Sequence, residues 1–286
     1  MTHQPDILVV GATGTTGRAV GDSLTAAGTR FRAMSRTPQR VTSPLATPVR
    51  GDLDDAASVR DALVGVRAAY LVTPSSEAAE RQQTLFIDQA MHAGVEHLVL
   101  LSQLGADAGS PVRFLRYHGV VEDHASRAGI GLTALRPNLF MQGLLAVAGT
   151  VRHTGTLPAP IGSAPVSIID ARDIGDVAAR AVVAAHPMGV QTLTGPEALT
   201  HAELADRLGT ATGQTISFDD VDPRRFEELL TGVLPSWQVA GVLEDYAHYA
   251  RGEAAEVSPA VPDLLGRPAR QFSAFANEHA DSFRAS

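Results

Sequence analysis

The sequence lacks two residue types, and each absence excludes a kind of chemistry. There is no cysteine among its 286 residues, which excludes disulfide bonds, thiolate nucleophiles and cysteine-ligated zinc sites. There is also no lysine, so all 23 basic residues are arginine. Schiff-base formation, a phosphate-binding P-loop lysine and any catalytic pair that needs an ammonium group are therefore excluded as well.

Long apolar runs and clusters of positive charge are absent too. No apolar segment reaches the roughly 20 residues needed to cross a bilayer, and the N-terminal segment lacks the basic start and the cleavage site of a signal peptide. We therefore expect a cytoplasmic protein with no membrane partner. The net charge is −8, so we do not expect nucleic acid as a partner, because its phosphates require a basic surface.

The composition is that of a folded globular protein, with 44% hydrophobic and 19% charged residues. In the first half, short apolar runs alternate with amphipathic stretches, which is typical of parallel βαβ units. We interpret as strands the runs at 6–10, 30–35, 68–73, 97–102 and 132–137, with a further apolar segment before Asp52. Helices are predicted at 76–94 and 111–127, and after Asp54, the expected N-cap of a helix that carries Val59, Leu63 and Val66.

The second half is less regular. Turns at 155–165 precede a predicted helix at 173–185, a strand at 189–195, a helix at 200–212, an extended run at 215–222 and two or three further helices. This order predicts an α/β fold, namely a Rossmann-like doubly wound parallel sheet with a small C-terminal α/β substrate lobe. We assign residues 1–155 to an NADP-binding domain and residues 156–286 to the smaller lobe, with the two parts intertwined.

The strongest local signal is a glycine motif that follows the first predicted strand and opens a helix. Gly11, Gly14 and Gly17 form a GxxGxxG pattern in the segment GATGTTG. Gly11 permits a tight turn, Gly14 lets the backbone approach a pyrophosphate, and Gly17 allows the helix to pack closely on the strand. We expect the start of this helix to bind the phosphates of a dinucleotide, with contacts that include Thr13, Thr15 and Thr16. The alternative is a tight turn that binds no ligand.

The residues after the second predicted strand select between the two nicotinamide cofactors. An acidic residue at this place binds the ribose hydroxyls of NAD, but the sequence has Ser35 and Arg36, with Arg40 nearby. Because arginine pairs with the 2′-phosphate of NADP, we predict NADP(H). The alternative is that both arginines are solvated loop charges. Asp52 and Leu53 are expected to meet the adenine, unless Asp52 is an unliganded turn residue.

Further segments carry a family resemblance over nearly the whole chain. They are GDLDD at 51–55, LVLLSQLGA at 98–106, HGVVE at 118–122, LTALRPNLFMQ at 132–142, DARDIGDVA at 170–178 and LTGPEALTHAELA at 193–205. Together with the glycine motif, they resemble the NmrA-like branch of the atypical short-chain dehydrogenase/reductase family. The resemblance implies an NADP-binding domain with a small substrate lobe. That family includes quinone, enone, imine and ketone reductases, and also redox-sensing regulators that bind the dinucleotide without turning it over.

The chain departs from the better-known relatives at their Tyr-x-x-x-Lys pair, in which the tyrosine donates a proton. Phe114 occupies the tyrosine position and His118 the lysine position. Hydride transfer is still expected, because the cofactor supplies the hydride. His118 is a candidate general acid, with Glu122 one helical turn later to orient it. The alternative is that His118 and Glu122 form a surface pair on an exposed helix.

The resemblance also implies which residues surround the nicotinamide and the substrate. Ser102 ends the fifth strand and is a candidate catalytic residue that hydrogen-bonds a substrate carbonyl, or else a serine that caps a turn. The expected cofactor contacts further include Thr73, Pro74 and Pro137. The expected substrate pocket contains Gln103, Phe114, Asn138, Phe140 and Met141. No metal site is expected.

Two functions are consistent with these residues. The first is an NADPH-dependent oxidoreductase that transfers hydride to a small or medium apolar carbonyl, quinone, enone or imine, with this small-molecule substrate as its partner. The second is a non-catalytic binding protein that senses the NADP/NADPH ratio, which the missing Tyr-Lys pair favours. We prefer the first, since no interaction domain or charged tail is apparent in the sequence.

Overall fold

A computed structural model describes residues 6–184 and 186–285. The chain divides into two compact units with interleaved segments. Unit 1 comprises residues 1–111, 115–136 and 171–192, and unit 2 comprises residues 112–114, 137–170 and 193–286. A single boundary after residue 155 does not describe this division, because the chain enters unit 2 near Pro137 and later returns to unit 1 for one helix and one strand.

Unit 1 is built around a parallel sheet. Its strands are β1 (Ile7–Val10), β2 (Phe31–Ser35), β3 (Ala46–Arg50), β4 (Ala68–Leu71), β5 (His97–Leu101), β6 (Gly131–Pro137) and β8 (Gly189–Leu193). In the described part of the chain their order is β3-β2-β1-β4-β5-β6-β8, and the ladders from β3 through to β6 are parallel. The order reverses between β1 and β4, which is where doubly wound sheets bind ligands. The predicted Rossmann-like fold is confirmed.

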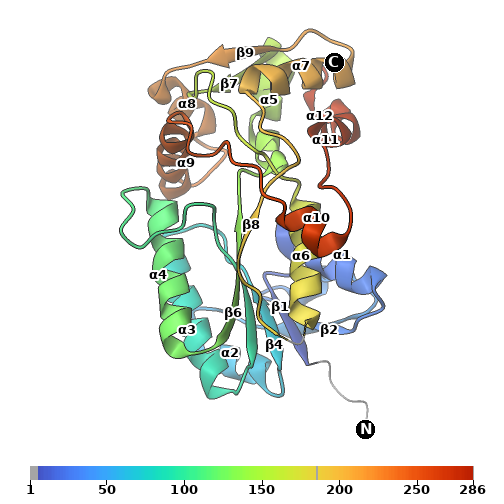
Figure 1. The fold of residues 1–286 in the computed structure, drawn as a ribbon, viewed down its shortest axis with the longest axis vertical. Helices are drawn as coiled ribbons and strands as arrows, with labels where there is room; N and C mark the ends of the chain where they lie inside the picture. The colour runs from blue at the N-terminus through green and yellow to red at the C-terminus, as the bar shows by residue number, and fades with distance from the viewer. Residues whose placement is uncertain (1–5, 185, 286) are drawn as a thin grey trace. The chain divides into compact units, whose positions relative to one another are not determined.

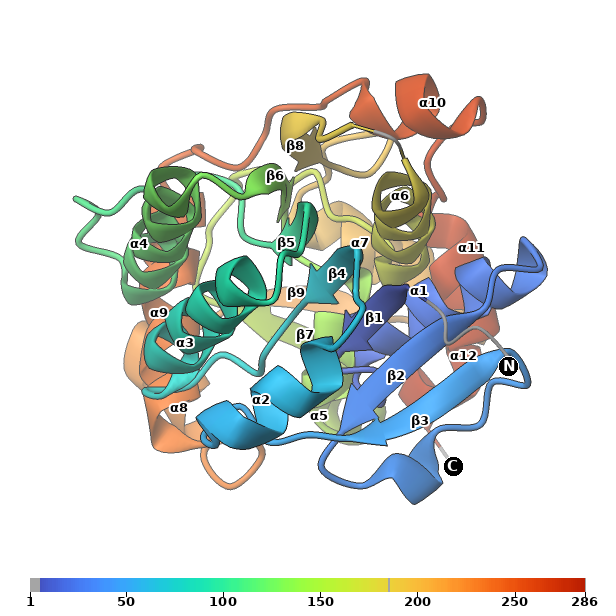
Figure 2. The ribbon, with the colours of Figure 1, turned by 90° about the horizontal axis from the view of Figure 1, so that it is seen from below.

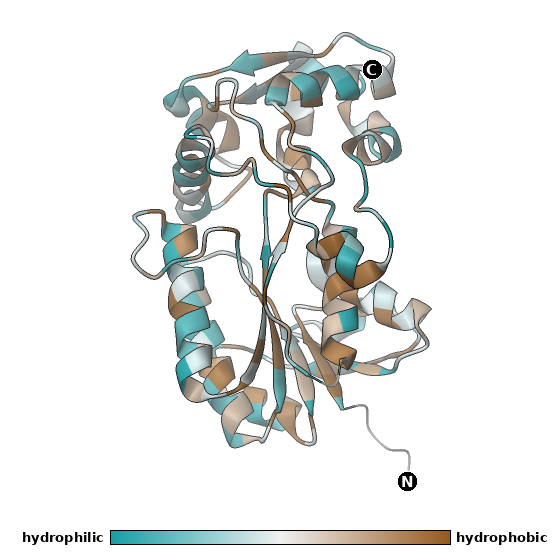
Figure 3. Cartoon of the chain, viewed as in Figure 1, coloured by the Kyte–Doolittle hydropathy of each residue, from teal (hydrophilic) through white to brown (hydrophobic). Residues whose placement is uncertain are grey.

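Helices cover both faces of this sheet. They are α1 (Thr15–Ala26), α2 (Ala56–Leu63), α3 (Ala79–His92), α4 (Arg113–Ala128) and α6 (Ala171–Val183). Figure 2 shows α2, α3 and α4 on one face and α1 and α6 on the other. Because successive strand residues point to opposite faces, Leu8 and Val10 join one core cluster with Phe86 of α3, while Val9 is buried on the other face. Strands β1, β4 and β5 are accordingly buried along their whole length, and Figure 3 colours much of this sheet as hydrophobic.

Local chemistry explains where the helices begin and end. Asp55 caps α2, since its side chain accepts a hydrogen bond from the backbone N–H of Ala57. The prediction that Asp54 is this cap was wrong, because the Asp54 carboxylate accepts hydrogen bonds from Arg81 and Gln82 of α3 instead. Gly129, which follows α4, has φ of +78°, the left-handed conformation that ends many helices.

Unit 2 combines a small sheet with several helices (Figure 1). Strands β7 (Thr156–Ala159) and β9 (Ser217–Asp220) pair in parallel. The helices are α5 (Ala148–Thr154), α7 (His201–Thr212), α8 (Pro223–Leu230), α9 (Ser236–Tyr249), α10 (Ala260–Leu265), α11 (Phe272–Glu278) and α12 (Ala280–Phe283), after a 3-10 helix at Met141–Val147. More helices follow β9 than the two or three predicted. Among the described residues of both units, no helix is long and apolar enough to span a membrane.

Candidate cofactor and active site

The glycine loop joins β1 to α1, and its three glycines have different roles. Gly11 has φ of +71°, and a Cβ there would lie 2.7 Å from Cγ1 of Val72. At Gly17, a Cβ would lie 2.1 Å from the carbonyl oxygen of Gly11. These two positions therefore accept glycine alone. A Cβ at Gly14 would meet the Gly11 oxygen at 3.4 Å, so the fold leaves room there, and the exposed face of Gly14 is open to a ligand.

The first turn of α1 is suited to bind an anion. The N-cap residue Gly14 has no side chain to bond the helix, and the first turn contains no acidic residue. Gly14 and Thr15 are exposed, whereas Thr16 and Gly17 are buried. Nη groups of Arg18 lie near this turn, because Arg18 Nε donates a hydrogen bond of 2.9 Å to the carbonyl oxygen of Thr13. Exposed N–H groups at the positive end of a helix dipole fit the diphosphate of a dinucleotide.

The segment after β2 presents the positive charge of two exposed arginines. Arg36 and Arg40 are exposed, and the Ser35 hydroxyl accepts a hydrogen bond of 3.1 Å from the Thr37 N–H. Hydrogen bonds from Arg81 and Gln82 lower the pKa of Asp54, and the charge of Arg36 contributes to the same shift. Among residues 6–184 and 186–285, the Arg36 side chain has no hydrogen bond or ion pair, and the nearby Asp54 carboxylate is bonded to Arg81 and Gln82.

Asp52 occupies a turn after β3. Its carboxylate accepts a hydrogen bond of 3.0 Å from the Asp54 N–H, and its own N–H donates one of 2.9 Å to Ser58 Oγ. Leu53 is half-buried and packs on the core cluster beneath α2. These contacts account for Asp52 as a turn residue, and its contact with adenine stays a prediction.

Ser102, Glu122 and Arg136 meet at the end of the sheet in unit 1. Ser102 follows β5, Glu122 lies on α4 and Arg136 lies on β6. The Ser102 hydroxyl donates a hydrogen bond to Glu122 Oε1, and Arg136 donates to both carboxylate oxygens at 2.9 and 2.7 Å. Glu122 is only 6% exposed. The prediction that Glu122 orients His118 was wrong, and so was the alternative of an exposed surface pair.

His118 is buried on the same helix. Its ring lies 4.0 Å from that of Tyr117, centroid to centroid, and its buried Nδ1 atom has no hydrogen-bond partner among the residues that the structure describes. Burial, with a further contribution from the charge of Arg136, lowers the pKa of His118 to about 3. The imidazole is therefore neutral near pH 7 and carries a single N–H. The Tyr117 hydroxyl is engaged with Ser75 Oγ at 3.1 Å.

The remaining predicted cofactor contacts of unit 1 follow β4. Thr73 is 8% exposed, and its hydroxyl accepts a hydrogen bond of 2.7 Å from Gln83 Nε2. Pro74 beside it is exposed. Gln103, the predicted substrate contact next to Ser102, is half-buried.

The other predicted pocket residues belong to unit 2, where several are used for packing. The Phe114 ring lies 5.3 Å from that of Trp237. Asn138 Nδ2 donates to Ser167 Oγ and to the Ala254 oxygen, both at 2.8 Å. Met141 is buried, whereas Phe140 keeps part of its surface exposed. Pro137, which was predicted to contact the cofactor and not the substrate, is buried as well. Substrate contact by these residues stays a prediction.

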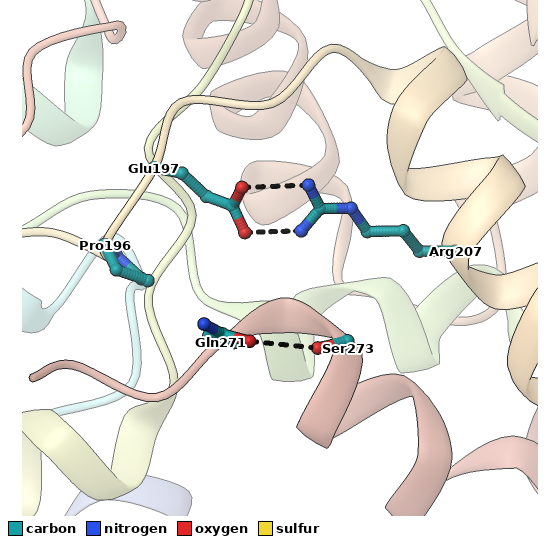
Figure 4. Close-up of a pocket in the computed structure, with 5 residues that line it drawn as sticks. All are labelled: Pro196, Glu197, Arg207, Gln271 and Ser273. Carbon is teal, nitrogen blue, oxygen red and sulfur yellow. Dashed lines mark hydrogen bonds and ion pairs between the residues drawn. The ribbon is translucent and has the colours of Figure 1, made fainter.

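Unit 2 also contains a cavity of about 420 Å³ that the sequence did not predict. Figure 4 shows two of its lining residues, Glu197 and Arg207, pointing toward each other, with the lining residues Gln271 and Ser273 beside them. One of the two bonds between Arg207 and Glu197 is 2.8 Å long. No sequence motif predicts this pair, because Glu197 lies in a loop, Arg207 lies on α7, and the other lining residues, Gln271 and Ser273, come from a third segment. The described residues contain no cluster of metal ligands.

Comparison with known proteins connects this geometry to a family. The model of the NmrA-like family matches residues 3–263. The chain belongs to the NmrA-like family. Among the relatives of this NmrA-like chain, an NAD(P)H azoreductase of Xenophilus azovorans is 35% identical over 98% of this chain and 99% of its own. Quinone oxidoreductase 2 of Escherichia coli is 28% identical over 92% of this chain and 94% of its own.

Solved structures share the fold of this NmrA-like chain. The NADPH complex of the Escherichia coli quinone oxidoreductase QOR2 matches with a TM-score of 0.87 and 25% identity, covering 95% of this chain and 99% of that one. The transcriptional regulator NmrA in complex with NADP matches with a TM-score of 0.78 and 15% identity, covering 96% of this chain and 95% of that one. At this identity, the likeness to the regulator concerns the fold alone.

Proposed function

We propose that this NmrA-like protein is an NADPH-dependent reductase of small molecules. The observation that carries the proposal is similarity along nearly the full chain to an azoreductase and a quinone oxidoreductase. The glycine loop supports it, since Gly11 and Gly17 shape a turn that no larger residue fits. The substrate class is an apolar electron acceptor such as a quinone, an azo compound, an enone, an imine or a ketone.

Unit 1 supplies the cofactor contacts in this proposal. The bound NADPH provides the hydride. The first turn of α1, which starts at Thr15, binds the diphosphate through backbone N–H groups, and Gly14 lets the diphosphate approach closely, while its own N–H donates to the Gly11 oxygen. Among the described residues, no carboxylate engages the guanidinium of Arg36 or Arg40. Both arginines can therefore pair with the 2′-phosphate, which NADPH has and NADH lacks. Thr73 and Pro74 complete the cofactor contacts beyond β4.

The proton must come from a group other than a tyrosine-lysine pair. The matching helical positions hold Phe114 and His118. A neutral His118 is not an imidazolium donor, but its N–H is available to orient a substrate oxygen or nitrogen while water supplies the proton. The neutral state follows from burial, which lowers the pKa of this imidazole to about 3. Ser102, the second predicted catalytic residue, contacts the reacting group in this proposal.

A turnover assay tests the function directly. The loss of NADPH absorbance is followed with quinones, azo dyes, enones, imines and ketones, and each assay is repeated with NADH. We expect turnover on at least one class and a preference for NADPH. In parallel, nicotinamide fluorescence reports whether the dinucleotide binds. Binding without turnover on any acceptor would instead support the sensor function, which the replacement of the tyrosine-lysine pair by Phe114 and His118 favours.

A further inference from the structure

The buried contact of Ser102, Glu122 and Arg136 assigns a specific role to the serine. We propose that Glu122 and Arg136 hold Ser102 as a hydrogen-bond acceptor, so that its oxygen binds the O–H or N–H group of the reduced product. The inference rests on the proposed function, since it places Ser102 at the reacting group. Within it, Ser102 is the binding residue, and Glu122 and Arg136 are positioning residues.

The proton positions in this contact have a single arrangement. Arg136 has only donors, and it donates to both oxygens of Glu122. The Glu122 carboxylate has only acceptors, so the bond with Ser102 uses the single hydroxyl proton of the serine. The Ser102 oxygen therefore keeps its lone pairs for another partner and has no proton left to give.

Burial keeps the arrangement fixed. Ser102 is 4% exposed and Glu122 is 6% exposed, so water does not replace a lost partner at low cost. The backbone also holds the serine, because its N–H donates a hydrogen bond of 2.7 Å to the Leu135 oxygen of β6. Turning the hydroxyl toward a substrate carbonyl would leave a buried carboxylate with fewer donors, which is unfavourable.

This polarity distinguishes the oxidised from the reduced ligand. A quinone or an azo compound offers only acceptor atoms at the reacting centre, whereas a hydroquinone or a hydrazine offers O–H or N–H donors. An acceptor at Ser102 therefore bonds the reduced form and leaves the oxidised form without a partner. The resulting preference contrasts with the role first predicted for Ser102, which was to donate a hydrogen bond to a substrate carbonyl.

Binding measurements test the inference without relying on turnover. The enzyme is saturated with NADP⁺, and calorimetry under anaerobic conditions gives the dissociation constants of a naphthohydroquinone and of the corresponding naphthoquinone. We expect Ser102→Ala to weaken the hydroquinone about tenfold, the upper range for one hydrogen bond, and to change the quinone less than about twofold. The inference is overturned if Ser102→Ala weakens the binding of the quinone alone, weakens the binding of both ligands equally, or leaves the binding of both unchanged.

A second variant tests the positioning pair. Glu122→Gln keeps the shape of the side chain but has one acceptor for three donors, so it no longer holds the Ser102 proton. We expect the preference for the hydroquinone to fall toward one. Asp123→Asn is the matched control, because this neighbouring carboxylate is exposed and faces Arg127 at 3.9 Å, outside the contact. If Glu122→Gln weakens both ligands equally, its role is structural and the inference is overturned.

The outcomes separate this inference from the proposed function. If the wild-type enzyme oxidises NADPH with an acceptor and Ser102→Ala binds both naphthalene ligands as the wild type does, the reductase stands and the role of Ser102 is refuted. If the wild type binds neither ligand, Ser102 does not recognise this product and the inference fails, whatever the turnover on azo dyes.

Discussion

The substitution Gly17→Ala tests the glycine loop, because the added methyl group meets only backbone atoms. Its Cβ would lie 2.1 Å from the Gly11 oxygen, 2.7 Å from the Gly11 carbonyl carbon and 3.0 Å from the Ala12 Cα. No side-chain rotation relieves such contacts. The start of α1 must move away from the loop by about 1 Å to restore ordinary contact distances.

The displacement has two measurable consequences. Forcing extra volume into a packed site costs about 1–3 kcal/mol of unfolding free energy. A shift of about 1 Å takes N–H groups out of hydrogen-bonding distance of the diphosphate, and each lost bond to a charged group costs about 1.5–3 kcal/mol, or about tenfold or more in affinity. We therefore expect Gly17→Ala to lower both the melting temperature and the affinity for NADPH, as measured by thermal denaturation and by nicotinamide fluorescence.

Two other glycines serve as controls. Gly14→Ala adds a methyl group at 3.4 Å from the Gly11 oxygen, at a residue with an ordinary φ of −83°. We expect this variant to keep the wild-type melting temperature but to bind NADPH more weakly, because the methyl group lies on the side where the cofactor is proposed to bind. Gly149→Ala meets nothing within 4 Å and should leave the affinity unchanged. Wild-type NADPH affinity in Gly17→Ala would refute the assignment of this loop to the cofactor.

Three further predictions concern other residues. Arg36→Ala should weaken NADPH about 10-fold or more, as expected for a charge-assisted bond, and leave NADH unchanged in the same fluorescence titration; equal losses would contradict a 2′-phosphate contact. The pKa of His118 is lowered from 6.5 to about 3 in the folded protein. As the pH falls from 6.5 toward 3, this histidine binds a proton in the unfolded chain but not in the folded one, so the stability that is present above pH 6.5 is lost over this range. Denaturant unfolding at several pH values should show a weaker decline for His118→Gln, and an unchanged slope would exclude His118 as its source. Thr200→Ala removes the capping box with Glu203 and should cost about 1 kcal/mol, seen as a lower denaturant midpoint; no change would mean that the cap does not limit the stability of α7.

Local sequence signals predicted the elements that depend on neighbours along the chain. The glycine spacing identified the turn between β1 and α1, because backbone crowding at Gly11 and Gly17 arises from residues within the same loop and the adjacent strand. The alternation of apolar runs with amphipathic stretches predicted the parallel sheet, because parallel strands are usually joined by a crossover helix. The connection from β2 to β3 is an exception, since it contains only a short 3-10 helix at Pro38–Arg40. The cap of α2 was displaced by one residue, since Asp54 finds stronger partners on α3.

The tertiary structure alone decided what each buried charge bonds. The spacing of His118 and Glu122 on one helical face predicted a contact between them, yet Glu122 bonds Ser102, 20 residues earlier, and Arg136, 14 residues later. A buried carboxylate is stabilised most by the strongest donors within reach, and only the packing of β5, β6 and α4 determines which donors those are. The sequence by itself determined the sheet and the glycine turn between β1 and α1, because both follow from the spacing of residues that are close together in the chain. The direction of the Ser102 proton depends on three separate segments meeting in space.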